Sequence, residues 1–83
     1  MRIMYFAWLR SRTGCSLEDV NPPAEVKDVR GLLEWLKQRS PGHKEALADL
    51  SVVRTAVNQE HVQLDYPVKA TDEIALFPPV TGG

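Results

Sequence analysis

The first twenty residues alternate between an apolar run, a polar gap and a second short apolar run. Residues 2–9 (RIMYFAWL) are almost continuously apolar, which predicts a β-strand. Gly14 lies among small polar residues at 10–16, which is typical of a hairpin loop. Residues 17–20 then predict the returning strand, which the two prolines of Asn21-Pro22-Pro23 end.

The hydrophobic period changes over residues 26–40. Apolar positions here recur at the i, i+3, i+4, i+7 spacing of one helical stripe: Val29, Leu32, Leu33 and Leu36. We place Lys37 and Arg39 in the last turn, where basic charge suits the helix dipole, and Ser40-Pro41-Gly42 after its end. Gly31 indicates close packing of this helix on a sheet, or it is simply tolerated at a cost of about 1 kcal/mol against alanine.

The second half of the chain reads mainly as short strands. A helical connection at 43–50 leads to a strand at 52–57, whose Val53, Thr55 and Val57 share one face. Asn58-Gln59 predicts a tight turn into a short strand at 60–64, and Pro67 interrupts the chain again. The last strand is 72–77, with Ile74 and Leu76 on one face and Ala75 and Phe77 on the other.

The predicted order is therefore strand, strand, helix, strand, short strand, strand. This order predicts an α+β fold, a mixed sheet with one main helix packed on one face. It is similar to the β-grasp arrangement of ubiquitin-like proteins, in which the first and last strands lie side by side in the middle of the sheet. We assign residues 1–77 to the β-grasp domain and 78–83 to an extended tail.

A single covering helix leaves the other sheet face open. We expect Phe6, Trp8 and Phe77 on this face, with His61 nearby. Exposed aromatic patches usually mark a partner site, although loops could cover some of these rings.

Size and composition narrow the class of protein. The chain has 83 residues, enough for one domain, and its 43% hydrophobic and 25% charged content is that of a globular protein. A net charge of −1 without a basic patch argues against nucleic acid, and no segment resembles a membrane span or signal peptide. The single cysteine, Cys15, cannot form an internal disulfide, so we expect a cytoplasmic protein.

The tail reads FPPVTGG and holds two of the five glycines. Pro78 and Pro79 would stiffen the chain as it leaves the last strand, and Gly82-Gly83 could pass through a slot too narrow for other residues. We expect a terminal carboxylate on Gly83, which becomes a reactive mixed anhydride when joined to AMP. The tail is therefore predicted to be a chemical handle that another protein activates.

Four segments resemble the small, sulfur carrier subunit of molybdopterin synthase: YFAWLR (5–10), VKDVRGLLEWL (26–36), AVNQEHV (56–62) and DYPVKATDEIALFPPVTGG (65–83). Many ubiquitin-like carriers share a terminal Gly-Gly, whereas AVNQE together with DEIALFPPVTGG is far more specific. The chain departs from the family at Ala70-Thr71, where Asp-Gly is frequent, and at Glu25, where a threonine often caps the helix.

The resemblance implies a mechanism. An adenylating enzyme related to ubiquitin-activating enzymes would use ATP to form an acyl-adenylate on Gly83, and a sulfur donor would convert it to a thiocarboxylate. The carrier would then dock on the large synthase subunit, in a heterotetramer of two large and two small subunits. There it would give sulfur to cyclic pyranopterin monophosphate to form the dithiolene of molybdopterin. Catalytic side chains would come from the large subunit, and no cofactor would stay bound to this chain.

The resemblance also assigns residue roles. Gly83 would carry the sulfur, and the tail threaded into partner active sites would be Pro78, Pro79, Val80, Thr81 and Gly82. The docking face would comprise Phe6, His61 and Phe77, with Arg10 at the end of the first strand pairing with an acidic partner residue. Strand alternation adds Trp8 to this docking face.

Other candidate residues have simpler interpretations. Cys15 could relay a persulfide, but a lone cysteine in a polar loop is more often incidental. His43 and His61 lack metal-ligand spacing and are expected at the surface. Asp72 and Glu73 point to opposite faces of a strand, so they are expected to be solvated rather than paired for catalysis, and Trp35 is expected to pack.

Two other functions remain open. One is a related carrier, for thiamine synthesis or tRNA thiolation, or a ubiquitin-like modifier that forms isopeptide bonds with lysine. The other is an interaction module of the same fold whose tail has no chemistry.

Overall fold

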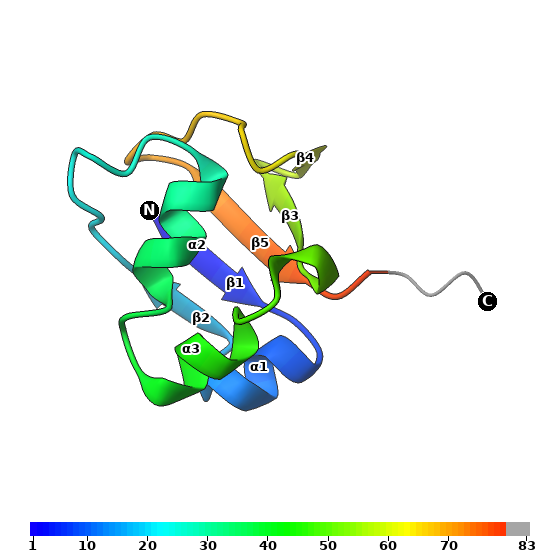
Figure 1. Ribbon diagram of the computed structural model, residues 1–83. Coiled ribbons are helices and arrows are strands. Elements are labelled where there is room, and N and C mark those ends of the chain that lie inside the picture. The colour runs from blue at the N-terminus through cyan, green and yellow to red at the C-terminus, as the bar shows by residue number, and fades with distance from the viewer. Residues whose placement is uncertain (80–83) are drawn as a thin grey trace.

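The computed structural model describes residues 1–79, so the predictions made for Val80, Thr81, Gly82 and Gly83 lie outside the described residues. Its framework is a five-stranded mixed sheet in the order β2-β1-β5-β3-β4 (Figure 1). The strands are β1 (Arg2–Tyr5), β2 (Leu17–Asp19), β3 (Arg54–Val57), β4 (Glu60–Val62) and β5 (Glu73–Phe77).

The predicted topology is confirmed. β1 and β5 pair in parallel at the centre of the sheet, while β2 pairs with β1, and β3 with β5, in antiparallel fashion. β4 forms the far edge, antiparallel to β3. The first and last strands of the domain are therefore neighbours, and the tail leaves from the middle of the sheet.

Three α-helices and a 3₁₀ turn complete the fold: α1 (Trp8–Thr13), α2 (Val29–Leu36), α3 (Pro41–Ala46) and η1 (Leu50–Val52). α2 crosses one face of the sheet, and α1 and α3 lie together at one end of it (Figure 1). Ile3, Ile74 and Leu76 on the central strands are fully buried beneath this helical layer. Within residues 1–79, every helix is too short or too polar to cross a bilayer.

The main helix carries the predicted apolar stripe, and all four of its stripe residues are fully buried. Its N-cap is Asp28, whose side chain accepts a 2.8 Å hydrogen bond from the backbone N–H of Gly31. The expectation that Glu25 occupies the cap position is therefore wrong. A Cβ on Gly31 would lie 3.1 Å from the Asp28 carboxylate oxygen, so the cap rather than the sheet accounts for the close space around this glycine.

This helix also ends earlier than predicted. It stops at Leu36 with Lys37 as the C-cap, so Arg39 lies outside it. Ser40-Pro41-Gly42 does not simply stop one helix, because it begins the next. Ser40 is the N-cap of α3 and accepts a 3.1 Å hydrogen bond from the backbone N–H of His43, and proline is well suited to the first helical position.

The prediction of one strand over residues 2–9 and a loop over 10–16 is wrong. β1 ends at Tyr5, Ala7 has a φ of 55°, and its carbonyl accepts the first hydrogen bonds of α1. Leu9 is fully buried from α1, so the second half of the apolar run belongs to a helix. An apolar run of this length does not distinguish a strand from a short buried helix.

The contact between α1 and α3 depends on Gly42. A Cβ added there would overlap the carbonyl oxygen of Arg12. The backbones of the two helices therefore lie in contact at this point, where a side chain would not fit. Gly14, with a φ of 80°, ends α1 in the left-handed conformation that glycine adopts readily.

The Asn58-Gln59 turn between β3 and β4 is confirmed. Both residues have positive φ values, 51° and 71°, as a type I′ hairpin turn requires. Asn58 is held from both ends of its amide, because its Nδ2 donates to Asp72 and its Oδ1 accepts from the backbone N–H of Glu73, each at 3.0 Å. Asp72 is 4% exposed, so the expectation that it is solvated is wrong.

The turn before β5 closes without a glycine. Asp72 donates its backbone N–H to the carbonyl of Lys69 at 3.0 Å, and its side chain accepts from the Lys69 N–H at 2.7 Å. Ala70 and Thr71, where relatives of the resembled family often have Asp-Gly, have no positive φ. This departure from the family pattern therefore leaves the start of the last strand intact.

Candidate functional site

The sheet face opposite α2 carries a row of residues that crosses all five strands and is apolar except for the histidine on β4. Met4 lies between Leu17 on β2 and Ala75 on β5, and Ala56 lies between Ala75 and His61 on β4. Their neighbours along the strands, including Ile3, Ile74 and Leu76, point into the core. We call this surface the open face.

The open face differs between its two ends. At the end where β1 begins, Arg2 pairs with Asp19 and Glu73 in the strand register, and its Nη1 lies 3.9 Å from a Glu73 carboxylate oxygen. At the opposite end, Arg54 faces Phe77, the last residue of β5. One end of the face thus carries an acidic and basic cluster, whereas the end from which the tail leaves combines the aromatic ring of Phe77 with the basic Arg54.

Three of the predicted docking residues gather near the end of β5. The rings of His61 and Phe77 lie 5.3 Å apart between centroids. Phe6 is 48% exposed, and its backbone N–H donates to the carbonyl of Leu76, the residue before Phe77. His61 is exposed and Phe77 half-buried, so these side chains form an accessible surface at the root of the tail.

The structure places Trp8 and Arg10 differently from the prediction. Both lie in α1 rather than on the first strand. Trp8 packs partly against the core, and the Arg12 guanidinium lies 5.2 Å from the centroid of its ring. Arg10 is exposed on the same helix, so a role in pairing with a partner stays a prediction.

The tail begins in line with β5. Pro78 and Pro79 are half-buried and continue away from the end of this strand (Figure 1). Because β5 is held on both sides by β1 and β3, the start of the tail is fixed by the centre of the sheet.

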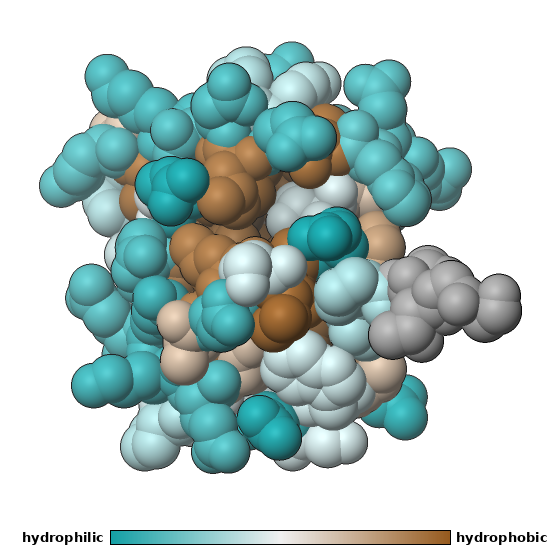
Figure 2. Space-filling model, turned by 45° about the vertical axis from the view of Figure 1, so that its right-hand side comes forward, coloured by the Kyte–Doolittle hydropathy of each residue, from teal (hydrophilic) through white to brown (hydrophobic). Residues whose placement is uncertain are grey.

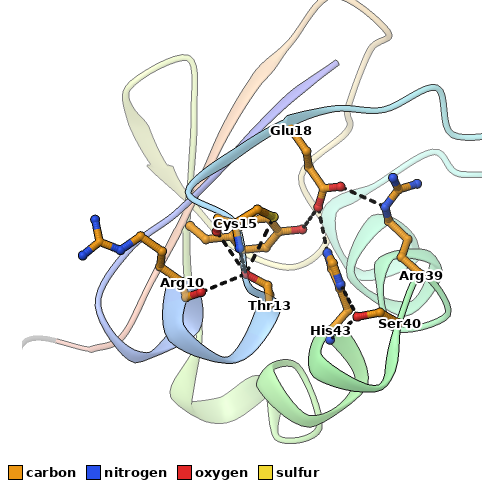
Figure 3. A network of polar contacts seen from close by, with 8 residues as sticks. Arg10, Thr13, Cys15, Glu18, Arg39, Ser40 and His43 are labelled. Atoms are coloured by element: carbon orange, nitrogen blue, oxygen red, sulfur yellow. Dashed lines mark hydrogen bonds and ion pairs between the residues drawn. The ribbon is translucent and has the colours of Figure 1, made fainter.

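A second group of polar side chains surrounds Glu18 on the edge strand β2 (Figure 3). Its carboxylate accepts hydrogen bonds from Tyr5 Oη at 2.7 Å and from Arg39 Nε at 3.0 Å, and it lies 2.8 Å from His43 Nε2. The other ring nitrogen of His43 lies 2.8 Å from Ser40 Oγ. The network ties β1 and β2 to the region between α2 and α3.

The expectation that His43 lies at the surface is wrong, because it is 6% exposed and its ring packs edge-on against Tyr5. Burial alone would raise the pKa of Glu18, but hydrogen bonds from His43 and Tyr5 and the charge of Arg39 together lower it. Burial, and then the Glu18 carboxylate, raise the pKa of Tyr5 above its usual range. Sequence reasoning missed this network because its members come from three separate segments of the chain and form no motif.

Cys15 lies beside this network. Its sulfur, a Glu18 carboxylate oxygen and a His43 ring nitrogen all lie within 4.8 Å of one another, an arrangement that could approach a metal ion. However, the carboxylate and both ring nitrogens already have close polar partners. Burial is the largest influence on Cys15 and raises the pKa of its thiol, which disfavours the thiolate needed for sulfur chemistry or metal binding.

Comparison of the sequence with known protein families assigns the chain to one of them. The sequence model of the ThiS family matches residues 3–83, nearly the whole chain. The protein belongs to the ThiS family. The family match includes the open face, the central strand β5 and the glycine-ended tail.

Curated relatives cover the full chain. The molybdopterin synthase sulfur carrier subunit of Escherichia coli (strain K12) is 35% identical over 83 residues, spanning 100% of this chain and 99% of the relative. The subunit of the same name from Haemophilus influenzae is 41% identical over 87 residues, with the same coverage. The resemblance to this family is therefore confirmed.

Solved structures support the same fold. A putative molybdopterin converting factor subunit 1 from Pyrococcus furiosus has a TM-score of 0.77 and 32% identity, covering 95% of each chain. A complex of subunits 1 and 2 of the molybdopterin-converting factor from Helicobacter pylori matches at a TM-score of 0.64 and 28% identity, covering 99% of this chain and 96% of that one. SAMP1 from Haloferax volcanii matches at 0.74 and 28%, covering 100% and 98%. These neighbours confirm the ubiquitin-like β-grasp fold.

Proposed function

We propose that this protein is the sulfur carrier subunit of a molybdopterin synthase. The observation that carries the proposal is the match, over the full chain, to relatives named as molybdopterin synthase sulfur carrier subunits. The fold supports it, because the central strand β5 leads directly into the Pro-Pro-Val-Thr-Gly-Gly tail.

The chemistry belongs to the last residue. In this proposal a partner enzyme uses ATP to join the Gly83 carboxylate to AMP, and a sulfur donor then displaces AMP to leave a thiocarboxylate. The soft, polarizable sulfur is the better nucleophile, and it is passed to cyclic pyranopterin monophosphate. Gly82 and Gly83 allow the tail to enter a narrow active site, since they have no side chains.

In this proposal the open face is the surface that contacts the partner protein. Phe6, His61 and Phe77 form the accessible aromatic surface beside the tail, and the large synthase subunit is the partner we assign to it. The Helicobacter pylori neighbour was solved as a complex of subunits 1 and 2, which supports such a pairing here. We further propose a cytoplasmic location and an assembly of two large and two small subunits.

The direct test is the intact mass of the protein after coexpression with its adenylating enzyme and a sulfur source. Exchange of one oxygen for sulfur on the peptide that ends in Gly83 is expected. A sulfur atom added to the peptide containing Cys15 would instead indicate a persulfide, and an unchanged mass with an active adenylating enzyme would contradict the proposal.

Deletion of Gly83 provides the matching functional test. The truncated chain should keep its fold and most of its affinity for the large subunit, since the strands that form the sheet and the open face are built from residues 2–77. Molybdopterin formation in a reconstituted assay should be abolished. Product formation by the truncated chain would show that Gly83 does not carry the sulfur.

A second candidate function is protein modification. The similarity to SAMP1 favours it, because a second structure of this small archaeal modifier protein from Haloferax volcanii also matches, at 27% identity and a TM-score of 0.74. A modifier would form isopeptide bonds between Gly83 and lysine side chains of other proteins. Tryptic digests of cells that express the tagged chain would show lysines carrying the tail remnant if this function holds, and none if the chain only carries sulfur.

A further inference from the structure

A hollow of about 480 Å³ lies beside the root of the tail, at the edge of the open face. It is bounded by η1, by the paired strands β3 and β4, and by the segment that follows β4. Figure 2 turns the side where β5 ends toward the viewer and shows apolar side chains there between hydrophilic ones. The volume of the hollow falls within the range of sites that hold small ligands or inserted side chains.

The lining of the hollow combines apolar and polar side chains, and its charged member is the basic residue Arg54. Leu50, Val53, Val62 and Leu64 supply the apolar part. No Asp or Glu is among the described residues that line it, and Arg54 is there with its guanidinium donating to the Ser51 carbonyl at 3.2 Å. Within residues 1–79, Arg54 has no carboxylate within ion-pair distance, so its charge is available to a partner.

Thr55 adds a second observation. It lines the hollow and is 4% exposed, and its hydroxyl is the one buried side-chain polar atom among residues 1–79 without a hydrogen-bond partner. Buried polar atoms are nearly always paired, and an exception calls for an explanation. A polar group of a bound partner that reaches past Val62, its cross-strand neighbour, would supply the missing bond.

The hollow is continuous with the surface proposed for docking. Arg54 on β3 pairs with Phe77 on the neighbouring strand β5. His61 lines the hollow and also makes the aromatic contact with Phe77. η1 ends at Val52, two residues before Arg54, which pairs with the last residue of β5. A protein that encloses the tail from its first residues therefore also reaches the mouth of this hollow.

We propose that the hollow is a second docking point for the large synthase subunit, which inserts an aliphatic side chain flanked by a carboxylate. The aliphatic group covers the four apolar lining residues, and the carboxylate pairs with Arg54. The inference rests on the proposed function, since that function supplies the protein that encloses the tail. Contact at the open face alone would restrict rotation of the carrier about its tail from one side. A second contact at the hollow would fix this rotation.

The test compares binding of the purified large subunit from the same source by calorimetry. Gln63→Trp places a bulky ring at the exposed rim of the hollow, and Arg54→Glu reverses its charge. Each variant should weaken binding at least tenfold, and the loss for Arg54→Glu should shrink as salt is added. Gln38→Trp and Arg30→Glu make the same exchanges at exposed positions of the helical layer and should change binding less than twofold.

The outcomes separate this inference from the proposed function. If the unchanged chain binds the large subunit and both rim variants bind equally well, the hollow is not a docking point, although the carrier function stands. The inference is also overturned if the rim variants weaken binding of the adenylating enzyme alone. If the unchanged chain neither binds the large subunit nor gains sulfur on Gly83, the proposed function itself fails. Circular dichroism of each variant checks that the fold is retained.

Discussion

Asp72 joins two turns that determine where the last strand begins. One carboxylate oxygen accepts from Asn58 in the hairpin turn, and the other from the backbone N–H of Lys69 in the turn before β5. Its own carbonyl accepts from the N–H of Arg2 at the start of β1. The Asn of the AVNQE segment and the Asp of the DEIALF segment are thus partners in space, which gives a physical reason for both residue types.

Replacing Asp72 tests this role at the level of one residue. Asp72→Ala should lower the free energy of unfolding by about 1–3 kcal/mol, because the Asn58 amide and the Lys69 N–H lose their acceptor. Asp65→Ala, at an exposed position, should change it by less than about 0.5 kcal/mol. Urea denaturation measures both, and equal stability of the two variants would contradict the role assigned to Asp72.

The Glu18 network predicts a dependence of stability on pH. Since the pKa of Glu18 is lowered in the folded state, the unfolded chain binds its proton first as the pH falls. Its stabilising contribution is therefore complete above the unfolded value of about 4.3, and it is lost as the pH falls through the lower folded pKa. Stability measured by urea titration should decline over this acid range.

A Glu18→Gln variant identifies the source of that decline. It should be less stable than the parent at pH 7 by about 1–3 kcal/mol, because an amide cannot accept all three donors. Its stability should also vary less with pH below about 4.3. Glu34→Gln, whose side chain is 53% exposed and pairs with Lys37, should keep the pH profile of the parent. An unchanged profile in Glu18→Gln would assign the pH dependence to other carboxylates.

At the level of elements, hydrophobic periodicity predicted the helices and turns that local sequence determines. It missed the features that depend on contacts between residues far apart along the chain. The stripe of α2 and the Asn58-Gln59 turn are local signals, and both are confirmed. α1 was missed because Trp8 and Leu9 continue the apolar run of β1 without a change of period. His43 was placed at the surface because the carboxylate that it meets is 25 residues away along the chain.

The packing of α1 on α3 gives a prediction for Gly42. Gly42→Ala should lower the free energy of unfolding by about 1–3 kcal/mol, since the new methyl group overlaps the Arg12 carbonyl and the two helices must separate. Gly31→Ala is the matched exchange in α2. There the methyl group meets a side-chain oxygen at 3.1 Å, and alanine favours the helix by about 1 kcal/mol, so the net change should be smaller. Thermal unfolding of both variants ranks them, and a larger loss for Gly31→Ala would contradict this account.

At the scale of the whole molecule, the two faces of one sheet separate stability from recognition. The face under α2 holds the core, whereas the open face meets solvent and leads to the tail. Strand order and alternation allowed this division to be predicted, because both follow from residue type and position along the chain. The hollow beside η1 could not be predicted, since it depends on how the segments around residues 50 and 63 approach each other.

Phe6 and Leu76 allow this division to be tested with neighbouring residues. Their backbones are joined by a 3.1 Å hydrogen bond, yet Phe6 is 48% exposed and Leu76 fully buried. Leu76→Ala should lower the free energy of unfolding by about 2–5 kcal/mol, because it leaves a cavity in the core. Below its unfolding transition, the Leu76→Ala variant should bind the large subunit as the parent does.

Phe6→Ala should change stability by less than about 0.5 kcal/mol but weaken binding roughly tenfold, as expected for an aromatic anchor. Denaturation and calorimetry on the same samples measure both quantities. Loss of stability without loss of affinity in Phe6→Ala would show that the open face serves the fold, and that docking uses another surface.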